Sequence, residues 1–232
     1  MRYWQTKYGT LVERLLWGWS SVYLVSFNNH YILVDTGPAV MSGTLLKKLL
    51  YLGITHIDAL VLTHTHFDHT GSAAVLKEKF KMPVIVHHSE AKYLESGISP
   101  LPHGSIPPTK FIYNLGAARV EHKFRVKRVI PDILVDESFD LSVFGLNARL
   151  VHTPGHTKGS CSMIIDGQIA ISGDTCVSLL PGRAFPPWAD DPETLVKSWK
   201  TLLDTGCELF LPMHHWNITR KTLEMEYEKR RT

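Results

Sequence analysis

The sequence has few cysteines and no long hydrophobic run. Its three cysteines among 232 residues are odd in number and lack the spacing of a disulfide-built secreted protein, which favours a reducing compartment. No stretch approaches the roughly 20 uninterrupted apolar residues that cross a bilayer. Residues 1–7 contain no apolar segment of the kind found in a signal peptide. We therefore expect a cytoplasmic protein without a membrane partner.

A strong charge bias is also missing. Lysine and arginine number 25 against 22 acidic residues, a formal net charge of +3, and this surplus is too small to indicate a nucleic-acid partner. With 44% hydrophobic and 20% charged residues, the chain has the composition of a soluble protein that buries a substantial core. We expect a single domain over residues 1–232, and leave a homodimer open.

Histidine, in contrast, is abundant, and several of the 13 are grouped. Directly after the apolar run 59–62 come four metal-capable side chains within six positions: His64, His66, Asp68 and His69. Alternate residues of extended chain face one side, so the first two form a chelating pair, and a turn after them would direct the other two to a second point nearby. Such ligands favour zinc, with iron or manganese as alternatives. The competing interpretation is a histidine-rich polar loop.

Further ligand candidates follow three other apolar runs. Residues 150–157 contain a Pro-Gly turn just before His156, residues 169–174 end in Asp174, and residues 209–215 end in His214 and His215. Because strand ends in layered α/β proteins deliver side chains to one edge, the pattern predicts a single site assembled from several strands.

These motifs together resemble those of the metallo-β-lactamase-fold metallo-hydrolase superfamily, in particular its glyoxalase II and lactonase-like members. His-x-His-x-Asp-His at 64–69, Thr-Pro-Gly-His-Thr-x-Gly-Ser at 153–160, Ser-Gly-Asp at 172–174 and Pro-x-His at 212–214 occur in the family's order. Residues 35–37 resemble its early Asp-Thr-Gly turn. The resemblance covers most of the chain. It implies an α/β fold, a four-layer αβ/βα sandwich with two mixed β-sheets packed face to face and helices outside.

The resemblance also implies a ligand set and a reaction. One divalent metal ion would be bound by His64, His66 and His156 and a second by Asp68, His69 and His214, with Asp174 bridging both; His215 is the alternative to His214. Two such cations, about 3.5–4 Å apart, can hold a bridging hydroxide as nucleophile and polarise the substrate. Asp68 and Asp174 are the expected catalytic carboxylates, Asp68 as proton shuttle.

Within this family the substrate is expected to be a small ester, thioester or lactone. A glyoxalase II protein usually adds a C-terminal helical region, and only about 18 residues follow His214. A nuclease of the RNase Z type would bring a longer chain and a stronger basic bias. Phosphodiesterase and β-lactamase activity remain alternatives, as does a metal-binding sensor without turnover, although a structural zinc needs only four closed ligands.

Two segments rich in proline and aromatic residues are candidates for shaping the substrate pocket. In residues 97–120 we expect prolines at 100, 102, 107 and 108 to exclude a regular helix; residues 175–190 would form an apolar lid, with a structural loop as the alternative. The candidate substrate-contacting residues are Trp17, Phe111, Tyr113, Arg183, Phe185, Trp188 and His215. A basic cluster could bind an anionic tail or simply be solvated: Arg119, Lys123, Arg125, Lys127 and Arg128.

Strands and helices are predicted to alternate, which indicates an α/β fold. The expected strands are 20–27, 30–35, 57–63, 84–87, 133–135, 139–143, 147–152, 161–165 and 168–172. The expected helices are 42–52, 71–80, 89–96, 191–203 and 219–230.

Overall fold

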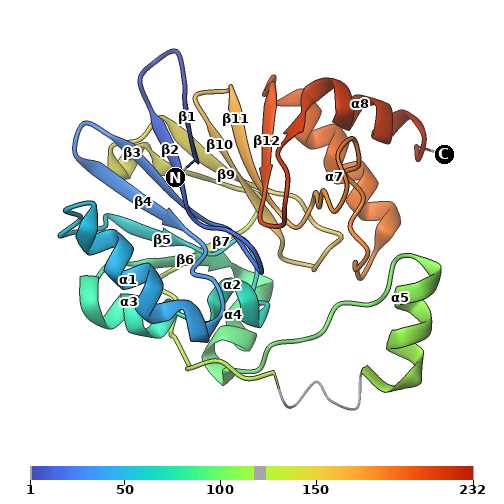
Figure 1. The fold of residues 1–232 in the computed structure, drawn as a ribbon, viewed down its shortest axis with the longest axis horizontal. Helices are drawn as coiled ribbons and strands as arrows, with labels where there is room; N and C mark the ends of the chain where they lie inside the picture. The colour runs from blue at the N-terminus through green and yellow to red at the C-terminus, as the bar shows by residue number, and fades with distance from the viewer. Residues whose placement is uncertain (1, 118–123, 232) are drawn as a thin grey trace.

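Two β-sheets lie face to face in the middle of the molecule, and helices cover the outer side of each (Figure 1). The computed structural model describes residues 2–117 and 124–231. Arg119 and Lys123 of the basic cluster lie outside these ranges, as does the end of the 97–120 segment. The predicted fold class, a four-layer αβ/βα sandwich, is confirmed.

The first sheet combines an antiparallel and a parallel half, in the strand order β1 to β7. Its strands are β1 (Arg2–Gln5), β2 (Leu11–Leu16), β3 (Val22–Phe27), β4 (His30–Val34), β5 (Ala59–Val61), β6 (Val84–His87) and β7 (Ile133–Val135). The strands β1 to β4 pair antiparallel, and β4 to β7 pair parallel. Asn28 and Asn29 join β3 to β4 with positive φ angles of 46° and 65°, which asparagine tolerates better than most residues.

The second sheet is mostly antiparallel, in the order β13-β12-β11-β10-β9-β8. Its strands are β8 (Ser138–Asp140), β9 (Ala148–His152), β10 (Cys161–Ile165), β11 (Ile169–Gly173), β12 (Leu209–Pro212) and β13 (Ile218–Thr219). The parallel pair β11 and β12 places two strand ends side by side. These two ends carry candidate ligands.

Alternation of side chains along the strands builds three hydrophobic layers. Tyr23 and Val25 point into the core between the sheets, where they join Leu150 and Met163 of the second sheet. Leu24, between them in sequence, points to the outer layer. Both faces of each central strand are therefore buried, as expected of a sheet covered by helices.

The outer helices pack on the two sheets separately. Helices α1 (Ser42–Tyr51), α3 (Ala73–Phe80) and α4 (His88–Ser96) contribute Leu45, Leu76 and Leu94 to the layer outside the first sheet. Helices α7 (Pro192–Asp204) and α8 (Arg220–Glu228) contribute Trp199 and Leu223 outside the second. In the described part of the chain, no helix combines the length and apolar character needed to cross a membrane.

The expectation that prolines exclude a regular helix from residues 97–120 is wrong for α5 (Pro107–Ile112), which continues into a π-helical turn at Tyr113–Ala117. Both Pro107 and Pro108 lie in the first turn, where a backbone N–H has no intrahelical acceptor to lose. Figure 1 shows α5 on an arm that leaves α4 and crosses to the side of α7.

Candidate metal centre

The site lies at one edge of the sandwich, where the two sheets are joined by backbone hydrogen bonds. Cys161 N–H of β10 donates to Thr63 O at 2.9 Å, and Ser21 N–H donates to Met213 O at 2.7 Å. Gly173, at φ +55°, packs so closely that a Cβ there would lie 3.0 Å from the Thr63 side chain. Glycine at this position therefore lets the end of β11 approach the end of β5 without strain.

Local structure after β5 directs the predicted ligands of the first half. His66 has extended backbone and is the N-cap of the short helix α2 (Phe67–Thr70). His64 and His66 precede this turn, and Asp68 and His69 lie within it, so the extended pair and the helical pair face different parts of one site.

Three histidine nitrogens meet at the first position. His64 Nε2 lies 2.9 Å from His66 Nδ1, and His156 Nε2 lies 3.0 Å from the same atom. All three side chains are buried. They come from the β5–α2 turn and the loop after β9, so residues some 90 positions apart in sequence converge. Three converging imidazole nitrogens are a characteristic zinc ligand set.

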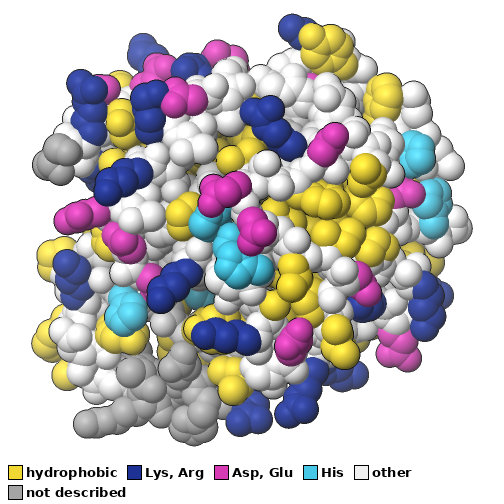
Figure 2. Space-filling view, turned by 180° about the vertical axis from the view of Figure 1, so that it is seen from behind, with side chains coloured by type: hydrophobic (Ala, Val, Ile, Leu, Met, Phe, Trp, Pro, Cys, Tyr) yellow, Lys and Arg dark blue, Asp and Glu magenta, His cyan; other side chains and the backbone are white. Residues whose placement is uncertain are grey.

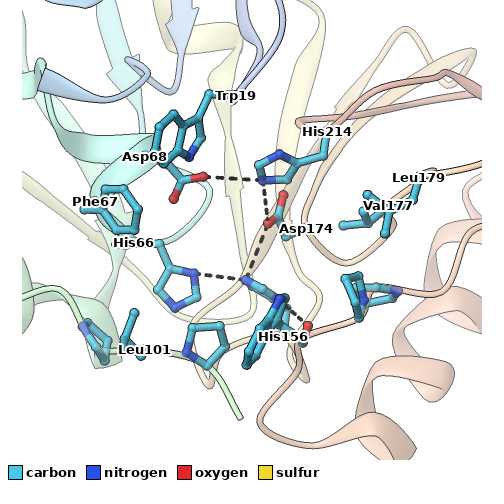
Figure 3. A pocket seen from close by; sticks show the side chains of 15 residues that line it. Trp19, His66, Phe67, Asp68, Leu101, His156, Asp174, Val177, Leu179 and His214 are labelled. Carbon is cyan, nitrogen blue, oxygen red and sulfur yellow. Dashed lines mark hydrogen bonds and ion pairs between the residues drawn. The ribbon is translucent and has the colours of Figure 1, made fainter. Parts of the chain in front are cut away.

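A second group lies next to the first. Asp68 Oδ2 is 3.7 Å from His69 Nε2 and 3.5 Å from His214 Nε2. Asp174 Oδ2 lies between the two groups, 3.6 Å from both His69 Nε2 and His156 Nε2 and 3.1 Å from His214 Nε2 (Figure 3). The structure therefore brings the seven predicted ligands together, with the Asp174 carboxylate between the two groups.

Electrostatics favour the metal-binding protonation state at His64, His66 and Asp174, and the proton-bound state at His69 and His214. Burial, and then the neighbouring histidines, hold the pKa values of His64 and His66 well below the usual range, so both are neutral and keep a lone pair for a cation. Burial opposes charge on His69 and His214, but the surrounding carboxylates outweigh it and raise both pKa values. Burial likewise opposes charge on Asp174, but His214 and His69 lower its pKa well below its usual range.

Two buried atoms at the centre indicate that the residues fit divalent cations. Nε2 of His69 and Oδ1 of Asp174 have no hydrogen-bond partner among the described residues. A buried polar atom without a partner costs free energy comparable to a lost hydrogen bond, and a cation between these residues would satisfy both. Histidine with carboxylate is a donor set for zinc, iron or manganese.

Asp35 holds two ligand-bearing segments in place. Its Oδ2 accepts a hydrogen bond from His69 Nδ1 at 2.7 Å, and the backbone and side chain of Thr63 donate to its two oxygens, each at 2.7 Å. Burial raises the pKa of Asp35, whereas His69 and Thr63 favour its charged form. Such a carboxylate fixes the tautomer and orientation of a ligating imidazole. The sequence offered a signal here, a carboxylate at the end of the apolar run 32–34.

Glu90 of α4 is a functional-site residue that sequence reasoning missed. It is buried, and one carboxylate oxygen accepts from Thr65 N–H at 3.0 Å and also from the Thr65 hydroxyl. The other accepts from Gly159 N–H at 3.2 Å. Glu90 thus ties the histidine-rich turn to the loop that carries His156. In sequence it reads as one of many charged helix residues, and no signal distinguishes it.

A cavity of about 460 Å³ opens onto the metal-ligand cluster. Its walls come from the turn after β2, from α2, from the arm before α5 and from the 175–190 segment. The lining residues are Trp19, His66, Phe67, Asp68, Pro100, Leu101, Pro102, His156, Asp174, Val177, Leu179, Pro186, Pro187, Trp188 and His214. Trp188 also holds a ligand in place, because its carbonyl oxygen accepts from His156 Nδ1 at 2.9 Å.

Of the seven substrate-contacting candidates, Trp188 lines this cavity and the other six do not. Phe111 is exposed on α5, and Tyr113 packs against His103. Phe185 packs on Trp199 behind the 175–190 segment.

The other three candidates, Arg183, Trp17 and His215, have local contacts outside the cavity lining. Arg183 is largely exposed and lies 3.9 Å from Glu226. Trp17 contacts Trp216 edge-on, and its indole N–H donates to the carbonyl oxygen of His215. His215, at φ +64°, follows a chain reversal that leaves its side chain outside the cavity lining, whereas His214 lines it.

Comparisons with known proteins agree with this geometry. The sequence profile of the metallo-beta-lactamase superfamily matches residues 16–214. A probable metallo-hydrolase of Methanocaldococcus jannaschii is 31% identical over 174 residues, 75% of this chain and 76% of that protein. The acyl-coenzyme A thioesterase MBLAC2 of Homo sapiens is 25% identical over 214 residues, 84% of this chain and 72% of that protein.

A solved structure agrees in fold as well. The protein TTHA1623, crystallised in a di-iron-bound form, has a TM-score of 0.67 and 27% identity, covering 93% of this chain and 98% of that one. Some other curated relatives are longer, and the match spans 50–60% of their length. The chain belongs to the metallo-β-lactamase superfamily of metal-dependent hydrolases.

Proposed function

We propose that the protein uses two divalent metal ions, zinc in the first instance, to hydrolyse the carbonyl bond of a small ester, thioester or lactone. The observation that carries the proposal is the seven-residue cluster, in which Asp174 Oδ2 lies between two groups of histidine nitrogens beside an open cavity. A structural zinc site is closed by four ligands and needs no cavity.

The metal ions, when bound, supply Lewis acidity and a water of lowered pKa. The chain would hold one through His64, His66 and His156 and the other through Asp68, His69 and His214. Asp68 lines the cavity, so its carboxylate can accept a proton from the attacking water and return it to the leaving alkoxide or thiolate. The products are a carboxylic acid and an alcohol or thiol, or a single hydroxy acid from a lactone.

The distribution of basic side chains on the surface favours a small substrate over a polynucleotide. On the face shown in Figure 2, lysine and arginine side chains are dispersed and do not form one continuous basic patch. The residues described around the cavity include neither lysine nor arginine. A phosphodiester backbone is normally held by several such cations.

The test is a substrate panel run on metal-loaded protein. Initial rates would be measured on a thioester, an aryl ester, a lactone, a β-lactam and a phosphodiester, with Asp68→Ala as the catalytic control and His152→Ala as a matched control. His152 is outside the ligand cluster, with Nε2 bonded to Lys158 O at 2.8 Å.

Turnover of one carbonyl class, lost in Asp68→Ala and kept in His152→Ala, is the expected result. Activity confined to the phosphodiester would move the assignment to a nuclease. Full metal loading with no turnover on any class would contradict the proposal and favour a sensor.

A further inference from the structure

Two large apolar side chains stand exposed at the mouth of the cavity. Trp19 is 65% exposed and Leu179 is 47% exposed, yet both line the cavity. Single exposed hydrophobic residues are ordinary, but two that face one cavity beside a reactive centre form an apolar entrance. Figure 3 shows Trp19 and Phe67 on one side of the metal ligands, and Val177 and Leu179 on the other.

We propose that this cavity binds an uncharged, apolar acyl group, and that Trp19 and Leu179 pack on it from opposite sides. The inference rests on the proposed hydrolase function and deepens it, because it names the part of the substrate that the protein selects. Arg183, one of the substrate-contacting candidates, lies outside the cavity lining and so offers no partner to an anionic group there.

The aromatic side of the entrance is supported from behind. The Trp19 ring meets the Phe67 ring edge-on, with centroids 6.1 Å apart, and Phe67 packs in turn on Phe124 at 4.9 Å. Phe67 belongs to α2, between His66 and Asp68. The aromatic wall is therefore fixed to the same turn that carries the ligands, which sets the position of an acyl chain relative to the reacting carbonyl.

The opposite wall is held by the backbone of its own loop. Val177 N–H donates to Ala184 O at 2.9 Å, and Ser178 forms an isolated β-bridge with His215. Val177 is buried, whereas Leu179 extends to the surface. This wall is thus fixed next to His214, on the far side of the ligands from Trp19.

The described lining offers little to an anion. Four of its residues are prolines, at positions 100, 102, 186 and 187, and proline has no backbone N–H to donate. The lining includes two carboxylates, Asp68 and Asp174, and no lysine or arginine. A carboxylate on the acyl group would lose its hydration without gaining a partner, whereas an apolar chain gains by leaving water.

The first experiment is a chain-length series with one leaving group. Acetyl, butyryl and hexanoyl esters would be compared with an adipoyl half-ester, which matches hexanoyl in length but ends in a carboxylate. We expect kcat/KM to rise on the order of two- to fourfold per methylene and to fall at least about tenfold for the adipoyl compound.

Variants of the two lining residues test whether the chain-length dependence arises at Trp19 and Leu179. Trp19→Ala and Leu179→Ala should flatten the chain-length dependence, because they lower kcat/KM for the hexanoyl ester more than for the acetyl ester. The matched controls are Trp17→Ala and Leu180→Ala, whose side chains are 59% and 65% exposed on the same two loops but do not line the cavity. Both controls should keep the slope of the wild-type protein.

A binding measurement makes the inference independent of turnover. Titration of 1-hexanol, followed by the indole N–H signals in NMR, should shift the Trp19 signal, identified by its loss in Trp19→Phe, and leave the Trp17 signal in place. A flat chain-length series, equal use of the adipoyl ester, or an unmoved Trp19 signal would overturn the inference while leaving the hydrolase proposal intact. Silence on the esters and on the thioester and lactone of the substrate panel, together with a shifted Trp19 signal, would instead contradict the hydrolase proposal alone.

Discussion

At the scale of single residues, His214 and His215 are adjacent but lie in different surroundings. His214 Nε2 lies 3.1 Å from Asp174 Oδ2, whereas His215 has a left-handed backbone conformation and its carbonyl oxygen accepts from Arg14 and Trp17. We expect His214→Asn to lower the metal content by about one ion per chain and the hydrolysis rate by more than about 100-fold. His215→Asn, which tolerates positive φ, should change neither. Metal content, measured by plasma mass spectrometry, and initial rates distinguish the two histidines. The reverse pattern would identify His215 as the metal ligand.

Asp35 acts on the centre without touching the cavity. Its carboxylate orients His69 and binds Thr63, and Asn at the same position keeps the shape and the positive φ of 57°. We therefore predict that Asp35→Asn folds but binds metal about 10- to 100-fold more weakly. Competition with a chromophoric chelator measures the affinity. Unchanged affinity would show that the hydrogen bond to His69 contributes nothing to binding.

At the scale of elements, the start of α4 carries a histidine that resists protonation. His87 is the N-cap, and its Nδ1 accepts from Ser89 N–H. Burial, followed by repulsion from the adjacent rings of His152 and His88, lowers its pKa to about 4, while Asp136 acts in the opposite direction. Because the unfolded chain takes up this proton near pH 6.5, the unfolded state binds more protons between pH 6.5 and 4, so stability falls as the pH falls through that window.

The variant His87→Asn tests the direction of this pH dependence of stability. Asparagine can accept the same N–H but does not titrate, so His87→Asn should lose less stability than wild type between pH 7.5 and pH 5. The expected difference is on the order of 1 kcal/mol, since solvent near the histidine stack screens the charge. Urea unfolding of metal-free protein at the two pH values gives the difference. Equal losses in both proteins would exclude His87 as the source.

Elements with a strong pattern were predictable, and those shaped by their neighbours were not. The predicted strands 133–135 and 161–165 agree with β7 and β10. Each is an apolar run that contributes side chains to the core between the sheets. The predicted helix 71–80 agrees with α3 but begins two residues later, at Ala73, because Gly71 and Ser72 separate it from α2, which ends at Thr70. A Cβ at Gly71 would lie 2.3 Å from Ala39 N, so a tertiary contact, not local propensity, decides the shape there.

At the scale of the whole molecule, the site also has parts that the sequence predicts and parts that it does not. The ligands follow four apolar runs in the sequence, and their motif order indicated that they would meet. The cavity walls depend on contacts between the arm before α5 and the 175–190 segment. Ser105 N–H donates to Pro187 O at 3.0 Å, and Ala189 N–H donates to His103 O at 2.8 Å. Such contacts join segments about 80 residues apart, and no local pattern specifies them.

The last prediction concerns how metal binding couples the two halves of the fold. Four of the seven candidate ligands lie after β5 of the first sheet and three follow strands of the second, so cations at the centre would join both sheets. A ligand that binds only the folded state stabilises it by RT ln(1 + [L]/Kd), about 2.7 kcal/mol at 100-fold excess over Kd. We expect chelation to lower the melting temperature by several degrees and added zinc or manganese to restore it. Asp174→Ala, which removes the carboxylate between the two groups of candidate ligands, should greatly reduce this dependence, whereas His152→Ala should keep it. A melting temperature indifferent to chelator, with metal removal verified by mass spectrometry, would show that the sheets hold together at this edge through Cys161–Thr63 and the other backbone hydrogen bonds alone.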